Sequence, residues 1–402
     1  MSHAEKVEHT PLTPWTGGSR ATLIAGGLGV VGCALVLGVA VLGDRAAAMH
    51  AWLFAYCYWL GLALGSLGWL MAFHAARARW VVVTRRLLEN AASSIPVFLL
   101  LAIPLLVFMR SLYLWVDPHP ELGYDMARLL EHKRPWLNPT FFIIRVGVYF
   151  AIWTALSEIL RRWSLRQDET RAIALTANSW KLGAGGMPLH ALAVSFAGVD
   201  WIMSLHPTWG STMFGLYVIS GNVVGACALW IVVTYLASRA GLLGGRLTPS
   251  HLHSQGKFLL AFTCFWAYVA FSQFMLVWIA NLPEEAPWYL ARAHGGWLPV
   301  ALILLVGHFA LPFAILLSRE VKKKPRAIAA IAIWILVMHA VDVYWLILPH
   351  LDDQKPSPRW TELAAFIGIG GIAIAFGLWR ARGKNVVPVG DPYLEESSRY
   401  SK

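Results

Sequence analysis

The sequence predicts an all-α protein that crosses a membrane ten times, and three observations point to this fold class. The 402-residue chain is 57% hydrophobic and only 14% charged, whereas a soluble domain carries about 25% charged residues. Apolar runs of roughly 20 residues, the length of a spanning helix, recur along the whole chain. No polar stretch between them is long enough for a separate soluble domain. Because backbone polar groups in a bilayer must be paired within their own segment, these runs are expected to be helices.

The ten expected helices follow one another with short connections. They cover residues 21–43, 51–73, 93–116, 140–161, 187–205, 212–238, 257–280, 298–318, 327–348 and 361–380. The prediction is therefore one membrane domain over residues 21–380, with an N-terminal tail at 1–20 and a C-terminal tail at 381–402.

Lysine and arginine are concentrated in both tails and in every second connection. Cytoplasmic loops of membrane proteins carry this excess, so both termini are predicted to be cytoplasmic. The formal net charge of +11 then reflects membrane orientation and attraction to anionic lipids, and it requires no nucleic-acid partner.

The four cysteines, Cys33, Cys57, Cys227 and Cys264, all lie within apolar runs. None of them forms a C-x-x-C or C-x-x-C-H motif. This pattern argues against an iron–sulfur cluster or a covalently attached haem in this chain, and it favours small buried side chains.

Two segments that end long apolar runs resemble each other. "VDWIMSLHP" begins at Val199 and "VDVYWLILP" at Val341, and each places an aspartate, Asp200 or Asp342, seven residues before a proline. Each aspartate is therefore expected roughly 10 Å inside the outer end of its helix. The preceding helices also match, with prolines at 139 and 299. This spacing of four helices predicts a parallel internal repeat of a first bundle (51–205) and a second bundle (212–348).

Polar side chains inside the apolar runs suggest a proton path, because a charge at the bilayer centre costs about 2.5–3.5 kcal/mol and persists when it has a function or a partner. From the cytoplasmic to the outer side the expected order is Glu158 and His190, then His308, then His339 with Ser272 and Gln273, then Asp342 and Asp200, and finally His206. His339 and Asp342 are three residues apart and share a helix face, where they can hold a proton between them.

Other members of this set have alternative interpretations. Arg145 can extend to the lipid headgroups or neutralise Asp200. Glu158 lies beside two arginines, which is typical of an interfacial ion pair. A lone histidine in a helix commonly only packs, but His308 lies four residues before Pro312, which leaves a backbone carbonyl without its usual donor.

A quinone site needs an aromatic wall and one or two hydrogen-bonding groups. Asp200, Trp201 and His206 are candidates to contact a quinone on this basis. The connection 281–297, "NLPEEAPWYLARAHGGW", is acidic, aromatic and rich in proline and glycine, which favours a docking surface or lid.

Three segments resemble one known family. They are "FWAYVAFSQFMLVWIANLPEEAPWY" (265–289), "HPTWGSTMFGLYVISG" (206–221) and "GHFALPFAILLSR" (307–319). These segments are similar to the ActF-type membrane subunit of bacterial alternative complex III, a quinol:electron-acceptor oxidoreductase. That subunit is related to the NrfD or polysulfide-reductase membrane subunits. The resemblance covers essentially all ten helices.

The resemblance implies two four-helix bundles, helices 2–5 and 6–9, with helices 1 and 10 at the periphery, in the bacterial inner membrane. It also implies partners: an ActC-type membrane subunit, an iron–sulfur protein, haem c subunits and a terminal oxidase. The haem c and iron–sulfur clusters would belong to those partners. In this family, quinol oxidation is associated mainly with the ActC-type paralogue.

The sequence therefore favours a cofactor-free subunit that supplies a proton path and a scaffold beside the quinol-oxidising subunit. Three alternatives stay open: this chain itself binds quinone, it is an ion-coupled secondary transporter, or it is a passive anchor. Transporters often interrupt corresponding helices of both repeats. Here Pro96 and Pro104 interrupt the third helix, whereas residues 258–280 contain neither proline nor glycine.

Overall fold

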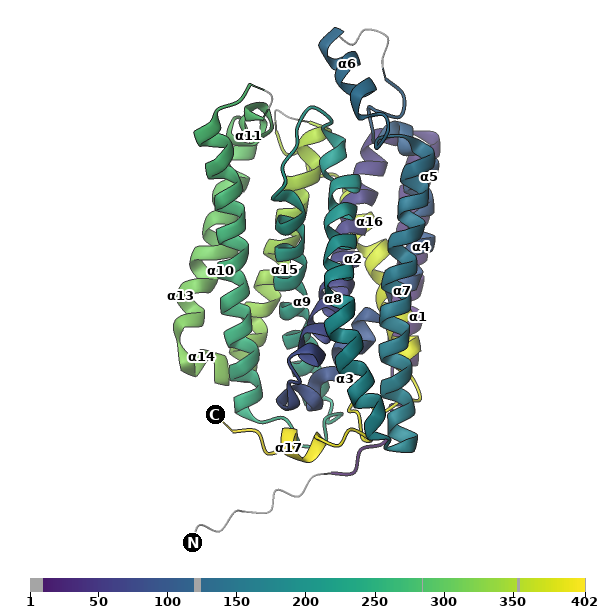
Figure 1. Ribbon diagram of the computed structural model, residues 1–402, viewed down its shortest axis with the longest axis vertical. Coiled ribbons are helices and arrows are strands. Elements are labelled where there is room, and N and C mark those ends of the chain that lie inside the picture. The colour runs from purple at the N-terminus through teal and green to yellow at the C-terminus, as the bar shows by residue number, and fades with distance from the viewer. Residues whose placement is uncertain (1–9, 119–123, 284, 353–354, 402) are drawn as a thin grey trace.

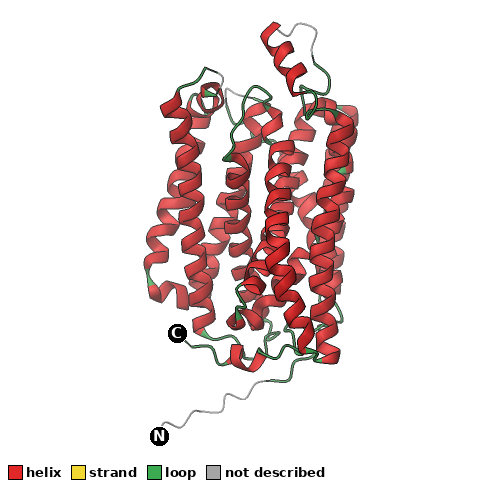
Figure 2. Ribbon diagram, in the orientation of Figure 1, coloured by secondary structure: helices red, strands yellow, loops and turns green. Residues whose placement is uncertain are grey.

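The computed structural model describes residues 10–118, 124–283, 285–352 and 355–401, and these residues form helices and loops without a β-strand (Figures 1 and 2). Ten helical stretches among them are long and apolar enough to cross a bilayer. The predicted all-α fold with ten spans is therefore confirmed, and the chain is a multi-pass membrane protein.

The helices follow one another along the chain from Ser19 to Ser398. They are α1 (Ser19–Leu42), α2 (Arg45–Ala75), α3 (Val82–Ala92), α4 (Ile95–Leu101), α5 (Ile103–Val107), α6 (Tyr124–Lys133), α7 (Pro139–Thr170), α8 (Ile173–Trp201), α9 (Phe214–Arg239), α10 (Pro249–Ala280), α11 (Ala286–Ala293), α12 (Trp297–Ile303), the π-helix η4 (Leu304–Ala310), α13 (Leu311–Leu317), α14 (Arg319–Lys323), α15 (Pro325–Ile347), α16 (Trp360–Ala381) and α17 (Leu394–Ser398).

The spanning helices form two rings of four neighbours, as the expected bundles require. In the first bundle α2, α4, α7 and α8 contact one another in a closed ring, and in the second α9, α10, the continuous segment α12–η4–α13, and α15 do the same. The two bundles meet mainly where α9 packs on α2 and α8, and Figure 1 shows them side by side. α1 and α16 pack on each other and against α2 at the periphery.

Glycines allow α1 and α16 to approach each other closely. A Cβ atom at Gly32 would lie 2.6 Å from the carbonyl oxygen of Ala364, and one at Gly371 would lie 2.5 Å from that of Ala25. Small residues at such contacts let helix backbones pack tightly where lipid removes the hydrophobic driving force.

Several helices extend further than the hydropathy pattern predicts, and their expected ends were wrong. The connection expected at 161–186 is only a two-residue turn, because α7 continues to Thr170 and α8 begins at Ile173. Helix α3 lies within the connection expected at 74–92, and α10 begins at Pro249 rather than 257. Hydropathy marks the apolar part of a helix, whereas the backbone hydrogen bonds continue into its polar ends.

The described ends of the chain lie at the same end of the molecule (Figure 1). Arg246 donates to the carbonyl oxygen of Thr10, and Thr248 donates to that of Tyr400. The charge pattern predicts that this is the cytoplasmic end, and the opposite end, with α6 and α11, is the predicted outer end. Residues 1–9 and 402 of the expected tails lie outside the described residues.

The C-terminal segment is packed rather than a free tail. Asp391 is buried and forms an ion pair with Arg85 at 2.8 Å, and Ser397 donates to the carbonyl oxygen of Trp80 at 2.7 Å. These contacts connect the chain beyond α16 to the start of the third span.

We expect Gly32→Ala to destabilise the protein, because the new methyl group would press on the α16 backbone, and overpacking costs about 1–3 kcal/mol. Gly38 lies on the same helix, and a Cβ atom added there would meet no other atom within 4 Å, so Gly38→Ala should be neutral or slightly stabilising. Thermal unfolding in detergent, followed by tryptophan fluorescence, compares the two variants. Equal midpoints for both variants would contradict the close packing.

Candidate functional site

Asp200 is fully buried and forms an ion pair with Arg145. The guanidinium donates from Nε to Oδ2 at 2.7 Å and from Nη2 to Oδ1 at 2.9 Å. The hydroxyl of Tyr149 donates to Oδ2 at 2.7 Å and the indole of Trp136 to Oδ1 at 3.0 Å. Of the two interpretations of Arg145, the structure therefore shows neutralisation of Asp200. Two parallel hydrogen bonds between a guanidinium and a carboxylate give this pair a fixed geometry.

Asp342 is the counterpart in the second bundle, and it has no such cation. Tyr217 donates to its Oδ1 at 2.6 Å, and Trp266 donates to its Oδ2 at 3.1 Å. The nearest basic group is His339, whose Nδ1 lies 3.9 Å from Oδ2. Among the described residues, no lysine or arginine reaches ion-pair distance. Both aspartates thus receive one tyrosine and one tryptophan donor, but only Asp200 has a fixed positive charge.

Two buried histidines continue from Asp342 into the second bundle. The ring of His308 lies 4.0 Å from that of Trp266 and 6.3 Å from that of His339, measured between centroids. Within the described part of the chain, neither ring nitrogen of either histidine has a hydrogen-bond partner. Buried polar atoms of this kind are commonly satisfied by ordered water. The structure therefore brings together His308, His339 and Asp342, three of the residues expected on a proton path.

The backbone around His308 is distorted into the π-helix η4 (Leu304–Ala310). Pro312 has no N–H group to bond the carbonyl four residues earlier, so the regular helix cannot continue through this turn. Trp334 donates to the carbonyl oxygen of Gly307 at 2.7 Å, which satisfies one group in the widened turn. π-Helical turns are frequent at functional sites.

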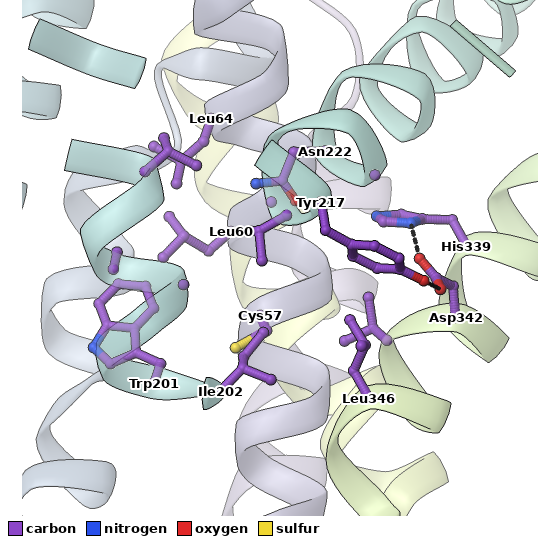
Figure 3. Close-up of a pocket in the computed structure, with 17 residues that line it drawn as sticks. Cys57, Leu60, Leu64, Trp201, Ile202, Tyr217, Asn222, His339, Asp342 and Leu346 are labelled. Carbon is purple, nitrogen blue, oxygen red and sulfur yellow. Dashed lines mark hydrogen bonds and ion pairs between the residues drawn. The ribbon is translucent and has the colours of Figure 1, made fainter. Parts of the chain in front are cut away.

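A narrow cavity of about 40 Å³ lies beside Asp342, between α2, α8, α9 and α15. Figure 3 shows His339 and Asp342 on one side of the cavity and Trp201 on the opposite side. Tyr217 lies between the His339–Asp342 pair and the rest of the cavity. Most of the lining is apolar, but Asn222 also faces the space. The cavity offers room for a few waters, since roughly 10–15 Å³ is enough for one.

Sequence reasoning missed Asn222, Tyr217 and Trp266. Asn222 is a polar residue in the middle of an apolar helix, which is the same signal that identified the aspartates. Tyr217 and Trp266 carry no such signal, because aromatic residues are abundant in this chain and only the fold shows which of them donate to Asp342.

The three residues expected to contact a quinone do not line one cavity. Asp200 is fully buried, with its oxygens occupied by Arg145 and two neutral donors. Trp201 lines the narrow cavity, whereas His206 lies beyond the end of α8, where its Nδ1 is 2.7 Å from the hydroxyl of Thr208. Among the described residues, no group of three His, Cys, Asp or Glu side chains could hold a metal ion.

The remaining expected residues lie in separate surroundings. Glu158 forms an ion pair with Arg380 of α16 at 2.7 Å, so the ion-pair interpretation holds, with a partner from another helix. His190 is buried against Gly68 of α2 and lies seventeen residues from the start of α8. It is therefore a mid-helix residue, and its expected place at the cytoplasmic end was wrong, because α8 begins earlier than hydropathy indicates.

Ser272 and Gln273 follow each other on α10 but differ in burial. Gln273 is buried, and its Oε1 has no hydrogen-bond partner among the described residues, whereas Ser272 is half-buried. Neither residue lines the cavity beside Asp342.

A second polar cluster lies at the predicted outer end, around Arg292 of α11. Its guanidinium donates to the carbonyl oxygens of Trp345 and Leu346 and lies 3.1 Å from Nε2 of His350. Burial lowers the pKa of Arg292 to about 9. A cation suits this position because the last carbonyls of α15 carry partial negative charge.

His206 completes the outer cluster. Its ring lies 5.7 Å from that of His350. Burial lowers the pKa of His206, and the nearby Arg292 lowers it further, so His206 is neutral at neutral pH. The connection 281–297, expected as a docking surface or lid, contains α11, whose Trp288 and Arg292 are buried.

Comparison with protein-family models finds no match to this chain, and comparison with characterised proteins finds none either.

We expect Arg145→Met to destabilise the protein by about 3–5 kcal/mol, because it leaves the Asp200 charge buried without a partner. The double variant Arg145→Met/Asp200→Leu should recover much of this loss, since it removes both charges together. Thermal or denaturant unfolding of the single and double variants tests this coupling. If the two variants were equally unstable, the ion pair would not be the reason for the loss.

Proposed function

We propose that this chain is the cofactor-free membrane subunit of a respiratory quinol-oxidising complex of the alternative complex III type, and that its second bundle conducts protons. The resemblance of three segments to ActF-type subunits supports the first part. The observation that carries the second part is the difference between the two aspartates: Asp200 is neutralised by Arg145, whereas Asp342 has only neutral donors and a histidine.

This difference suggests separate roles for the two carboxylates. An aspartate paired with a guanidinium holds α7 and α8 together, because breaking such a buried pair leaves an uncompensated charge. An aspartate held by neutral donors can be neutral or charged, because no fixed cation stabilises the ionised form. In this proposal Asp342 carries the exchangeable proton, and Asp200 belongs to the scaffold.

The path enters the second bundle at His308 and continues through His339 to Asp342. The ring centroids of the two histidines are 6.3 Å apart, and His339 Nδ1 lies 3.9 Å from Asp342 Oδ2. Both separations exceed a direct hydrogen bond. Each transfer therefore uses a bridging water or a side-chain rotation, and each moves one proton without a change in oxidation state.

In this proposal, the other subunits of the complex carry out quinol oxidation and electron transfer. An ActC-type membrane subunit oxidises the quinol, and an iron–sulfur protein and haem c subunits at the outer side take up the electrons, with a terminal oxidase as a further partner. The chain lies in the bacterial inner membrane with both termini in the cytoplasm, and lipids cover its apolar outer faces.

A secondary transporter is the alternative from another functional class. Helix α10 runs unbroken from Pro249 to Ala280, whereas its counterpart in the first bundle is divided into α3, α4 and α5. Gentle detergent extraction separates the two proposals: a complex subunit should retain haem c and iron–sulfur partners through purification, and a transporter should purify alone.

We expect Asp342→Asn to abolish or strongly reduce proton translocation by the assembled complex, because asparagine cannot bind and release the proton. Proton release per electron, measured with the complex in proteoliposomes, gives the result. Glu158→Gln is the matched control and should behave as the wild type, since Glu158 forms a structural ion pair with Arg380. Normal coupling in Asp342→Asn would remove the basis for this proton path.

A further inference from the structure

The cavity beside Asp342 is elongated along the helices. Its lining extends along α8 from Val194 to Ile202, the residue just after the helix, and along α15 from His339 to Leu346. At about 1.5 Å per residue, these stretches correspond to roughly 10–12 Å along the helix axes. The cavity therefore covers about a third of the thickness of the apolar membrane core.

The two ends of the cavity differ in chemistry. In Figure 3, His339 and Asn222 lie toward one end of the cavity, together with Leu64, and Ile202 and Leu346 lie at the other end, which is closer to the predicted outer side. The carbonyl oxygen of Leu346 accepts a hydrogen bond from Arg292, so this apolar end adjoins the outer polar cluster. The cavity thus lies between the histidine–aspartate pair and the predicted outer surface.

The few polar groups in the lining point to water as the occupant. His339 is 1% exposed, and both of its ring nitrogens lack a hydrogen-bond partner among the described residues. Asn222 adds an amide that can both donate and accept. A volume of about 40 Å³ is too small for a quinone ring with its substituents but accommodates about three waters.

The close packing of α2 preserves this space. A Cβ atom at Gly61 would lie 2.3 Å from Oδ1 of Asn222, and one at Gly65 would lie 2.1 Å from the Asn222 carbonyl oxygen. Glycine at these two positions lets α2 and α9 approach each other while the Asn222 side chain keeps its place at the cavity.

We propose that this cavity is a water-binding chamber, in which about three waters hydrogen-bond to Asn222, His339 and Asp342 and accept the proton that Asp342 releases. The neutral carboxyl group gives its proton to the first water, each water passes one proton on to the next, and the last water releases one to solvent at the predicted outer side. Protonated His339 then gives its proton to the carboxylate and takes up another through His308, so that charge and atoms balance. Asn222 is a positioning residue that orients the first water. The role in conduction rests on the proposed function, whereas the hydration does not.

Hydration is tested in native membranes by a millisecond X-ray pulse in ¹⁸O-labelled water, with hydroxyl labelling read by mass spectrometry. Trp201 and Tyr217 line the chamber and should be labelled at least about threefold faster than Trp52, a buried tryptophan away from it. Equal labelling of these residues would show a dry cavity and would overturn the proposal.

Two substitutions at Ala197, which lines the chamber, provide matched variants. Ala197→Leu fills the space and should lower labelling of Trp201 to the level of Trp52, whereas Ala197→Ser leaves room for water and should retain it. Thermal unfolding of both variants verifies that they fold. Labelling that persists in a folded Ala197→Leu protein would place the water elsewhere and contradict the chamber.

The role in conduction is tested by proton release per electron in the intact complex. Ala197→Leu and Asn222→Leu should each reduce it several-fold, with Ala197→Ser close to the wild type. Normal coupling in both leucine variants would overturn the role of the chamber while leaving the proton path through Asp342 intact. Conversely, a hydrated chamber with normal coupling in Asp342→Asn would reject the proposed function and leave the water site standing.

Discussion

The close approach of α2 and α9 at Gly61 and Gly65 is the contact on which the rest of the architecture depends. Helix α2 is the most enclosed span, with contacts to α8, α9, α15, α16 and α1. In a bilayer, helices associate through van der Waals packing and internal hydrogen bonds, because lipid tails are as apolar as the side chains. Two glycines four residues apart let the α9 backbone lie directly against α2, so the two bundles share one interface and the cavity forms within it.

A second pair of glycines, on α9, allows α15 to approach α9 closely. A Cβ atom at Gly221 would lie 3.1 Å from the ring of His339, and one at Gly225 would lie 2.7 Å from it. The imidazole therefore occupies the space that side chains would fill on α9. Backbone packing thus positions the histidine beside Asp342, and this couples the geometry of the polar cluster to the spacing of the helices.

The two bundles accommodate a buried aspartate in two different ways. Each bundle buries an aspartate near the predicted outer end, and each supplies a tyrosine hydroxyl and an indole N–H to it. The first bundle adds a guanidinium and obtains a stable, fully satisfied ion pair. The second has histidines and a widened helical turn in place of a cation, and its aspartate lines the cavity between the two bundles. The first aspartate is thus held in a structural ion pair, and the second is the one to which the proposed function assigns the exchangeable proton.

The sequence by itself determined the membrane fold, the ten spans and the positions of the two aspartates, because hydropathy and the cost of burying charge act on short segments. It also identified His339, His308 and the missing backbone donor at Pro312. Helix ends were less predictable, since α7 and α8 continue as helices through polar residues, and this displaced His190 from its expected depth. The tertiary structure alone decided that Arg145 joins Asp200, that Tyr217 and Trp266 join Asp342, and that Asn222 faces a cavity. These pairings join residues 55 to 125 positions apart, and they depend on which helices become neighbours, which no local pattern specifies.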